Sequence, residues 1–470
     1  MTLKEHINQN PGFRYVMEQL ELLSGVSRQM LHKTEFCSNA DILQQRWQEV
    51  EAVAHALDNC NDAAAINDLG HALMQIRDIT TTFLNCKQKV VLDDVQLFEV
   101  KNFAMLSNAI AGHVDTIGIG GIVTLPDLSE VVSLLDPDRN GVPHFYIYDS
   151  YDQRLPLIRK ELRTLQTQTA PDADTEKRIA ELWQQNAEVE NEVRKTLSHS
   201  LSRFADDMLE AIRQIACLDI LLAKCRLNKR YGLCMPAIGT TVCYKDLYNI
   251  RLQDVLAEKG GSCQPVDIEF GEGACVITGA NMAGKTVLLK SVGIAQLMAQ
   301  FGFYVPASEA QIVPVSDVLF CIGDEQDEMN GLSSFASEML KINDIIQQTK
   351  QSRLLVLIDE PARTTNPYEG MAIVDAIVDY LHRQHSFALL TTHYSGLQSQ
   401  CKRLRVKGLQ QHLDDSQKIT PQNINSFIDY SLTEDSTGNV PQEALRIADI
   451  LNFDDEVLDK ARKLLKTKNS

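Results

Sequence analysis

One eight-residue segment constrains the fold more than any other part of this 470-residue chain. The segment Gly279-Ala280-Asn281-Met282-Ala283-Gly284-Lys285-Thr286 satisfies the pattern G-x-x-x-x-G-K-[ST]. It follows an apolar run that predicts a strand and precedes a helical pattern, which is the context in which such a loop binds phosphate. Its backbone N–H groups would surround phosphate oxygens, Lys285 would neutralise the β- and γ-phosphates, and the Thr286 hydroxyl would coordinate Mg²⁺. The segment therefore predicts a P-loop that binds a magnesium nucleotide.

An acidic pair follows a second apolar run. The run from Leu354 to Ile358 is apolar throughout, as expected of a central strand, and ends at Asp359 and Glu360. Ligands of open α/β sheets bind at the carboxyl ends of the strands, so this pair should lie beside the P-loop. Asp359 is predicted to hold Mg²⁺ through water and Glu360 to orient or deprotonate the attacking water. Alone, an Asp-Glu pair is usually a solvated strand end; the P-loop favours the catalytic interpretation.

Two further motifs are weaker by themselves. His393 ends a third apolar run and could sense the γ-phosphate, although a lone histidine is usually structural. The segment from Gly331 to Met339 opens a helix with small polar residues, among them Ser333, and resembles a second anion-binding helix terminus. Taken alone, that segment is better explained as an ordinary helix cap.

The chain divides into parts of different texture. Residues 1–235 have helical periodicity and few glycines, which predicts a mainly helical core or lever domain. Residues 236–425 alternate short apolar runs with helices, which predicts an α/β P-loop NTPase domain with a parallel sheet. Residues 426–470 are predicted to form a helical tail. The longest helical stripe begins near Thr175 and extends to Ile215, as in a lever helix or one face of a bundle.

Charge and composition limit the possible partners. The net charge is −18 and the sequence contains no dense run of Lys and Arg, which opposes sequence-independent attraction to nucleic acid but leaves a local basic groove possible. The N-terminus does not have the form of a secretory signal, and no apolar run is long enough to cross a bilayer. The 11 cysteines are scattered singly and are read as reduced thiols. A cytoplasmic protein with no membrane contact is expected.

Together these motifs resemble the MutS family of ATPases. The resemblance covers nearly the entire C-terminal half and rests on five segments: Thr278 to Thr286, Phe303-Tyr304-Val305-Pro306-Ala307, Ser333-Ser334-Phe335, Leu357-Ile358-Asp359-Glu360 and Thr392-His393-Tyr394. It implies an ABC-like ATPase domain that uses ATP and Mg²⁺ in a homodimer. In such a dimer Ser333 of one subunit would reach the γ-phosphate bound to the other subunit's P-loop. The helical pattern from Ala444 to Arg462 is similar to the family's dimerising tail.

The sequence also departs from the family pattern. The branch that it resembles best is the bacterial one without a mismatch-reading domain, and we expect a short form that lacks mismatch-recognition, clamp and C-terminal nuclease-like domains. Where the family inserts a DNA-gripping clamp, this chain has a turn around Ala170 to Asp174. After Glu360 the family's glycines are replaced by Ala362, Arg363 and Thr364. No clear aromatic residue precedes the P-loop to stack on adenine.

Two classes of function remain open at this stage. In the first, the chain is a MutS-type ATPase whose nucleotide cycle is coupled to binding of duplex or branched DNA or to mismatch repair. In the second, the same dimer motor remodels or reactivates a client protein without binding DNA. The resemblance favours the first class, whereas the missing clamp and the acidic charge favour the second.

Overall fold

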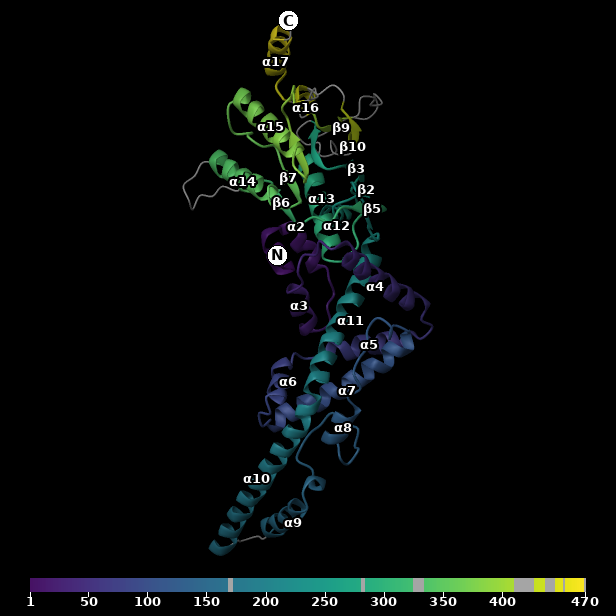
Figure 1. Cartoon of the computed structure of the whole chain (residues 1–470), viewed down its shortest axis with the longest axis vertical. Helices are drawn as coiled ribbons and strands as arrows, with labels where there is room; N and C mark the ends of the chain where they lie inside the picture. Colours follow the sequence, from purple (N-terminus) through teal and green to yellow (C-terminus); the bar gives the residue numbers. More distant parts are fainter. Residues whose placement is uncertain are drawn as a thin grey trace. The chain divides into compact units, whose positions relative to one another are not determined.

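The computed structural model describes residues 1–167, 172–279, 284–323, 334–409, 427–435, 444–450 and 453–468 (Figure 1). The chain forms two compact units. A helical unit contains residues 21–33 and 49–225, and an α/β unit contains residues 1–20, 34–48 and 226–470. The domain boundaries predicted at 235 and 425 from sequence texture remain predictions.

The helical unit is built from amphipathic helices, as the periodicity of the first half predicts. Two helices, α4 (Ala40–Asn59) and α11 (Ala205–Tyr231), contribute residues to both units. The other elements are α3 (Gly25–His32), α5 (Ala63–Gln75), α6 (Thr80–Lys87), α7 (Asp94–Ile117), α8 (Ser129–Leu135), η1 (Asp149–Tyr151), α9 (Arg154–Gln166), α10 (Ala173–Leu201) and η2 (Ser202–Phe204).

The predicted long helical stripe is confirmed. Helix α10 begins at Ala173, where the Asp172 side chain accepts a hydrogen bond from the Thr175 backbone N–H and so caps the first turn. The 3₁₀ turn η2 separates α10 from α11, so the stripe runs through two consecutive helices. Helix α9 lies antiparallel to α10, and Arg178 Nε donates to Glu161 Oε1 at 2.8 Å between them.

A six-stranded sheet forms the centre of the α/β unit. Its spatial order is β10-β9-β4-β8-β7-β6, and all neighbours are parallel except β10, which is antiparallel to β9. The three strands predicted from apolar runs are confirmed as β4, β8 and β7, and they are adjacent. The bounds are β4 (Gly273–Thr278), β6 (Asp317–Cys321), β7 (Leu354–Ile358), β8 (Phe387–Thr392), β9 (Lys402–Leu409) and β10 (Ile428–Glu434).

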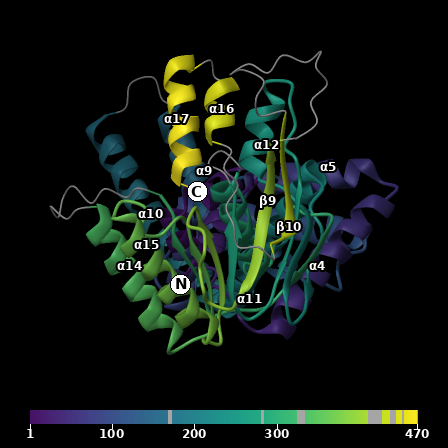
Figure 2. The same ribbon diagram turned by 90° about the horizontal axis from the view of Figure 1, so that it is seen from above.

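Helices cover both faces of this sheet because alternate residues of its central strands point in opposite directions. On one face α14 (Ser334–Thr349) and α15 (Pro367–His382), green in Figure 2, bury Ile342 and Val374 against Val356. On the other face α13 (Lys285–Gln300) approaches closely at Gly293, where an added Cβ would lie 2.3 Å from Phe320. The expected α/β P-loop fold after a helical region is confirmed.

Smaller elements complete the α/β unit. A four-stranded sheet has the order β1-β5-β2-β3, and the N-terminal helices pack against α13, where a Cβ added to Gly12 would lie 2.7 Å from Ile294. No helix among the described residues is long and apolar enough to span a membrane. The bounds are α1 (Leu3–Gln9), α2 (Pro11–Glu18), β1 (Ala237–Ile238), β2 (Val242–Leu247), α12 (Ile250–Ala257), β3 (Val266–Phe270) and β5 (Glu309–Ile312).

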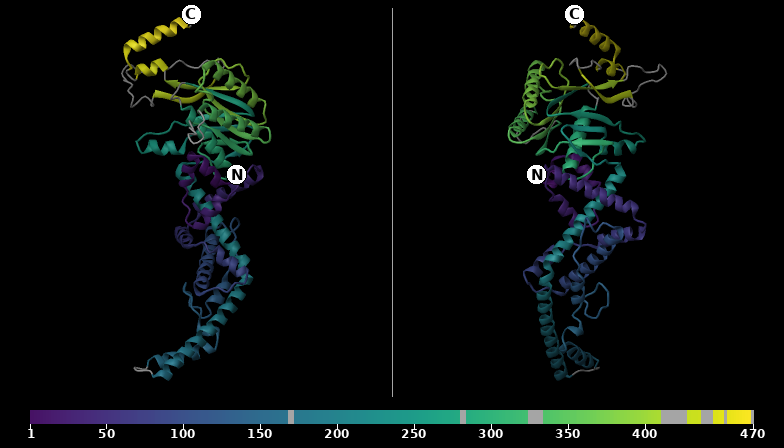
Figure 3. Two further views of the ribbon diagram at one scale, coloured as in Figure 1. Left: turned by 90° about the vertical axis from the view of Figure 1, so that its left-hand side faces the viewer. Right: turned by 45° about the vertical axis from the view of Figure 1, so that its right-hand side comes forward.

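The C-terminal helices α16 (Ala444–Ile450) and α17 (Asp455–Lys468), yellow in Figure 3, contact each other. Arg462 on α17 pairs with Asp449 on α16 at 2.6 Å. The tail predicted over residues 426–470 is therefore helical only in part, because Ile428–Glu434 pair with β9 and form strand β10 of the sheet. The role of α16 and α17 in dimerisation remains a prediction.

Candidate functional site

Lys285 is held at the carboxyl edge of the sheet. Strand β4 ends at Thr278, and Gly284 adopts a left-handed φ of 72° that turns the chain into α13. Lys285 is the first residue of that helix and is only 5% exposed. Its Nζ donates to the Gly279 carbonyl at 2.7 Å and lies 3.2 Å from Glu360 Oε1. The predicted residues Ala280, Asn281, Met282 and Ala283 lie outside the described residues.

Asp359 joins the ends of three parallel strands and the P-loop helix. Its backbone N–H donates to the Cys321 carbonyl at the end of β6. One carboxylate oxygen accepts from Thr286 Oγ1 at 2.7 Å, and the other accepts from Thr391 Oγ1 of β8 at 2.5 Å. The sequence places these residues far apart, and the strand order β4-β8-β7-β6 brings them together. Asp359 therefore lies beside the P-loop, as the sequence predicts, and accepts a hydrogen bond from the Thr286 hydroxyl.

A hydroxyl and a carboxylate 2.7 Å apart suit a small hard cation, because Mg²⁺ prefers oxygen ligands. In the part of the chain that the structure describes, no cluster of three or more His, Cys, Asp or Glu side chains could hold a metal. The Thr286 hydroxyl and the Asp359 carboxylate fit Mg²⁺, because this ion commonly uses one or two protein ligands and completes its shell with substrate phosphates and water. Thr286 and Asp359 are thus the residues that fit the ion.

Glu360 lies next to Lys285 in a constrained backbone. Its φ is 44°, in the left-handed region that non-glycine residues seldom adopt, and its N–H donates to Thr391 Oγ1 at 2.9 Å. Its side chain is 14% exposed, and its second carboxylate oxygen lies 3.8 Å from Arg363. The carboxylate is therefore held at the site's mouth between two cations, close to where phosphate would contact Lys285.

His393 follows β8 and is half-buried beside the same groups. Burial lowers its pKa below the usual value, the charge of Glu360 acts in the opposite direction, and Lys285 and Arg363 lower it further. The ring is therefore uncharged at neutral pH, and its N–H can donate a hydrogen bond to an anion. The structure brings His393, Glu360 and Lys285 into one electrostatic neighbourhood.

Ser333 lies outside the described residues, and α14 begins directly after it at Ser334. The predicted helix that this segment opens is confirmed. What Ser333 contacts stays a prediction.

Tyr430 is a site neighbour that the sequence does not signal. It lies on β10, the edge strand, and an added Cβ at Gly284 would lie 2.8 Å from its ring. An aromatic ring thus packs against the P-loop glycine from a strand far along the chain. No local motif marks Tyr430, because its proximity depends on the antiparallel pairing of β10 with β9.

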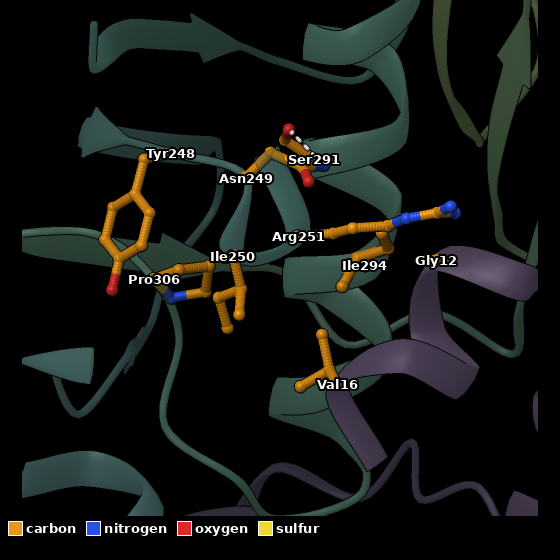
Figure 4. A pocket seen from close by; sticks show the side chains of 9 residues that line it. All are labelled: Gly12, Val16, Tyr248, Asn249, Ile250, Arg251, Ser291, Ile294 and Pro306. Carbon is orange, nitrogen blue, oxygen red and sulfur yellow. Dashed lines mark hydrogen bonds between the residues drawn. The ribbon is translucent and has the colours of Figure 1, made fainter. Parts of the chain in front are cut away.

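A separate small cavity of about 10 Å³ lies between α2 and α13 (Figure 4). That volume is about the space that one water molecule needs, so the cavity is too small for a ligand. Asn249 Nδ2 donates to Ser291 Oγ across one wall at 3.2 Å, and no P-loop or acidic site residue lines it. We assign it to imperfect packing of the N-terminal helices on α13. Its lining residues are Gly12, Val16, Tyr248, Asn249, Ile250, Arg251, Ser291, Ile294 and Pro306.

The residues that form this site lie in a segment that matches known proteins. Residues 275–468 match the family model MutS domain V. The endonuclease MutS2 of Caldanaerobacter subterraneus subsp. tengcongensis is 36% identical over 242 residues, 51% of this chain and 30% of that protein. The DNA mismatch repair protein MutS of Thermus aquaticus is 32% identical over 251 residues, 52% of this chain and 30% of that protein. The similarity thus spans about a third of the length of these relatives.

Proposed function

We propose that this chain binds and hydrolyses ATP with Mg²⁺ in a site completed across a homodimer, because residues 275–468 match MutS domain V, which is an ATPase domain. The observation that carries the proposal is the convergence of Lys285, Glu360 and Asp359 at the ends of β4 and β7. These side chains meet within hydrogen-bond distance of one another or of Thr286. The same groups would serve phosphate binding, water activation and metal binding.

Each residue has a distinct role in this proposal. Lys285 exchanges its contact with Glu360 for the β- and γ-phosphates, which frees the Glu360 carboxylate to accept a proton from the attacking water. The neutral His393 ring donates to the γ-phosphate. The P-loop backbone would donate N–H groups to the phosphates at the N-terminus of α13, as its sequence predicts.

Thr286 and Asp359 would hold Mg²⁺. When bound, the ion neutralises charge that develops on the phosphates. Thr391 fixes the Asp359 carboxylate from the opposite side, so the ligand oxygen facing Thr286 is oriented before the nucleotide arrives.

Completion of the site requires a second subunit. Ser333 precedes α14 and is proposed to reach the γ-phosphate held by the partner's P-loop, with α16 and α17 contributing to the dimer. The chain's resemblance to the family supports this arrangement.

Two kinds of partner are candidates for the molecule on which the ATPase acts: DNA and a client protein. The relatives' names include mismatch repair and endonuclease activity, which supports coupling to duplex or branched DNA. The charge of the helical unit supports a client protein instead. Residues 21–33 and 49–225 contain 29 Asp and Glu against 18 Lys and Arg, a net charge of −11. Such a surface repels phosphate backbones.

One experiment tests the motor and its load together. Phosphate release from ATP should require Mg²⁺ and stop when the metal is chelated. Binding to homoduplex, mismatched and branched DNA should then be titrated against salt, with and without ATP. A steep loss of affinity with salt would identify a DNA load, whereas no binding at low salt would leave the client protein. Absence of Mg²⁺-dependent hydrolysis would overturn the proposed function.

A further inference from the structure

The backbone of Ala362, two residues after Glu360, is held by hydrogen bonds on both sides of the residue. The Ala362 N–H donates to Glu338 Oε2 on α14 at 3.2 Å. The Ala362 carbonyl accepts from the Tyr394 hydroxyl at 2.8 Å. One residue of the loop therefore connects the helix that follows Ser333 with the segment that follows β8.

The loop backbone does not adopt this shape by preference. Ala362 has a φ of 58° and Glu360 a φ of 44°, both in the left-handed region where a Cβ is disfavoured. Such conformations persist only when the surroundings determine them. At Ala362, hydrogen bonds with Glu338 and Tyr394 hold both the backbone N–H and the backbone carbonyl in place.

Tyr394 is itself fixed tightly. A Cβ added to Gly370 of α15 would lie 2.2 Å from the Tyr394 hydroxyl oxygen, so only glycine admits the ring there. Burial raises the pKa of Tyr394, and the nearby charge of Glu338 raises it further, so the hydroxyl stays protonated as a donor. The tyrosine cannot move without moving α15 or the loop.

Helix α14 shares the packing of the loop. Phe335 and Met339, on the first turns of α14, pack against the buried cluster that contains Ala362 and Tyr394. A displacement of the start of α14 is therefore transmitted through side-chain packing as well as through the Glu338 hydrogen bond.

We propose that Glu338 is a positioning residue that couples the start of α14 to the catalytic carboxylate of Glu360 through the Ala362 peptide. The inference rests on the proposed function, because it assumes that Glu360 activates water. Engagement of Ser333 by the nucleotide of the partner subunit would shift α14, and Glu338 would carry that shift to the loop. In this proposal Glu338 acts on Glu360 through the backbone of Ala362.

The test compares three variants of the full chain in their dimeric form. Glu338→Ala removes the acceptor for the Ala362 N–H, Glu338→Gln keeps an acceptor oxygen, and Asp344→Asn is the matched control at an exposed carboxylate of the same helix. We expect Glu338→Ala to lower kcat by about tenfold to a hundredfold, because small displacements of catalytic groups cost that much. Its Kd for the non-hydrolysable analogue AMP-PNP should stay within about twofold, since the P-loop is untouched.

The amide variant supplies the discriminating control. Glu338→Gln should keep most of the parent's kcat, and Asp344→Asn should keep all of it. Hydrogen exchange at the Ala362 amide should accelerate in Glu338→Ala and stay slow in Glu338→Gln. If Glu338→Ala does not fold, Tyr394→Phe supplies the same test from the carbonyl side, with kcat reduced and the Kd for AMP-PNP retained.

Several outcomes would overturn the coupling. If the parent hydrolyses ATP and Glu338→Ala has the same kcat, the coupling is rejected and the proposed function is retained. A parallel loss of kcat and AMP-PNP affinity, not rescued by Gln, would assign Glu338 a purely structural role. Failure of the parent to hydrolyse ATP would reject the proposed function, and the coupling with it.

Discussion

Each unit of this molecule buries a lysine beside a carboxylate, and the two pairs serve different ends. In the helical unit Lys101 is 0% exposed and lies 3.1 Å from Asp136. It also donates to the His144 carbonyl at 2.8 Å and to the Tyr148 hydroxyl at 3.0 Å, so all three ammonium hydrogens have partners. In the α/β unit Lys285 is 5% exposed and pairs with Glu360.

The difference lies in where the partners come from. The partners of Lys101 all belong to one irregular segment, residues 136–148, which the lysine fastens to α7. The named partners of Lys285 come from the ends of β4 and β7, the edge where parallel sheets bind ligands. A buried lysine thus has a structural role when its partners belong to one loop that it holds in place. It can bind a ligand when its partners lie at the ligand-binding edge of a sheet.

The largest expected effect sharpens the catalytic side of this comparison. Glu360→Gln should lower kcat by about a hundredfold to ten-thousandfold, as loss of a general base does, while ATP binding persists. Phosphate release and equilibrium ATP binding measure the two separately. Glu272→Gln is the matched control, since Glu272 forms a surface pair with Arg353 before β4 begins. Unchanged hydrolysis in Glu360→Gln would reject the role of Glu360.

The second effect concerns the stability that the buried Lys101–Asp136 pair gives to the helical unit. Lys101→Met leaves the Asp136 carboxylate buried without its cation, and loss of one partner of a buried pair costs about 3–5 kcal/mol. Urea denaturation followed by circular dichroism should show this loss, and the double variant Lys101→Met/Asp136→Asn should recover part of it. ATP affinity measured below the transition should match that of the parent. Weakened nucleotide binding in the folded variant would contradict the division of roles.

The same contrast explains how much the sequence could predict. The P-loop, the strand before it and the acidic pair are local patterns, so the α/β fold and the proximity of Glu360 to Lys285 were predictable. The contact of Asp359 with Thr391 and that of Tyr430 with Gly284 depend on strand order, which no local pattern encodes. Lys101 lies within an amphipathic helix, and no local pattern marks it as the partner of Asp136.

The helical periodicity of the first half of the chain did not indicate which of its residues belong to which compact unit. Residues 1–20 and 34–48 are helical or irregular, like those that follow, yet they cluster with the α/β unit. Their hydrophobic side chains meet α13 and the turn after it; Phe13 stacks on Phe301 with ring centroids 5.8 Å apart. Helical periodicity identifies a buried face but not the partner that covers it.

The smallest expected effect separates the two units by their response to acid. Burial alone would raise the pKa of Asp136, but hydrogen bonds from the Gly141 and Asn140 backbone and the Lys101 cation outweigh it and lower the pKa below 3.8. The pKa of His393 is lowered from 6.5, chiefly by burial. The unfolded chain therefore binds more protons than the folded one first at His393 and, only at much lower pH, at Asp136.

This order predicts where stability is lost. The contribution of neutral His393 is complete above pH 6.5 and declines as the pH falls towards its lowered pKa, whereas that of Asp136 is complete above pH 3.8 and declines below it. Urea midpoints of the parent and His393→Asn should therefore draw together or cross between pH 7 and pH 5, because only the parent takes up this proton on unfolding. A difference that stays constant over this range would show that His393 is not held neutral by the fold.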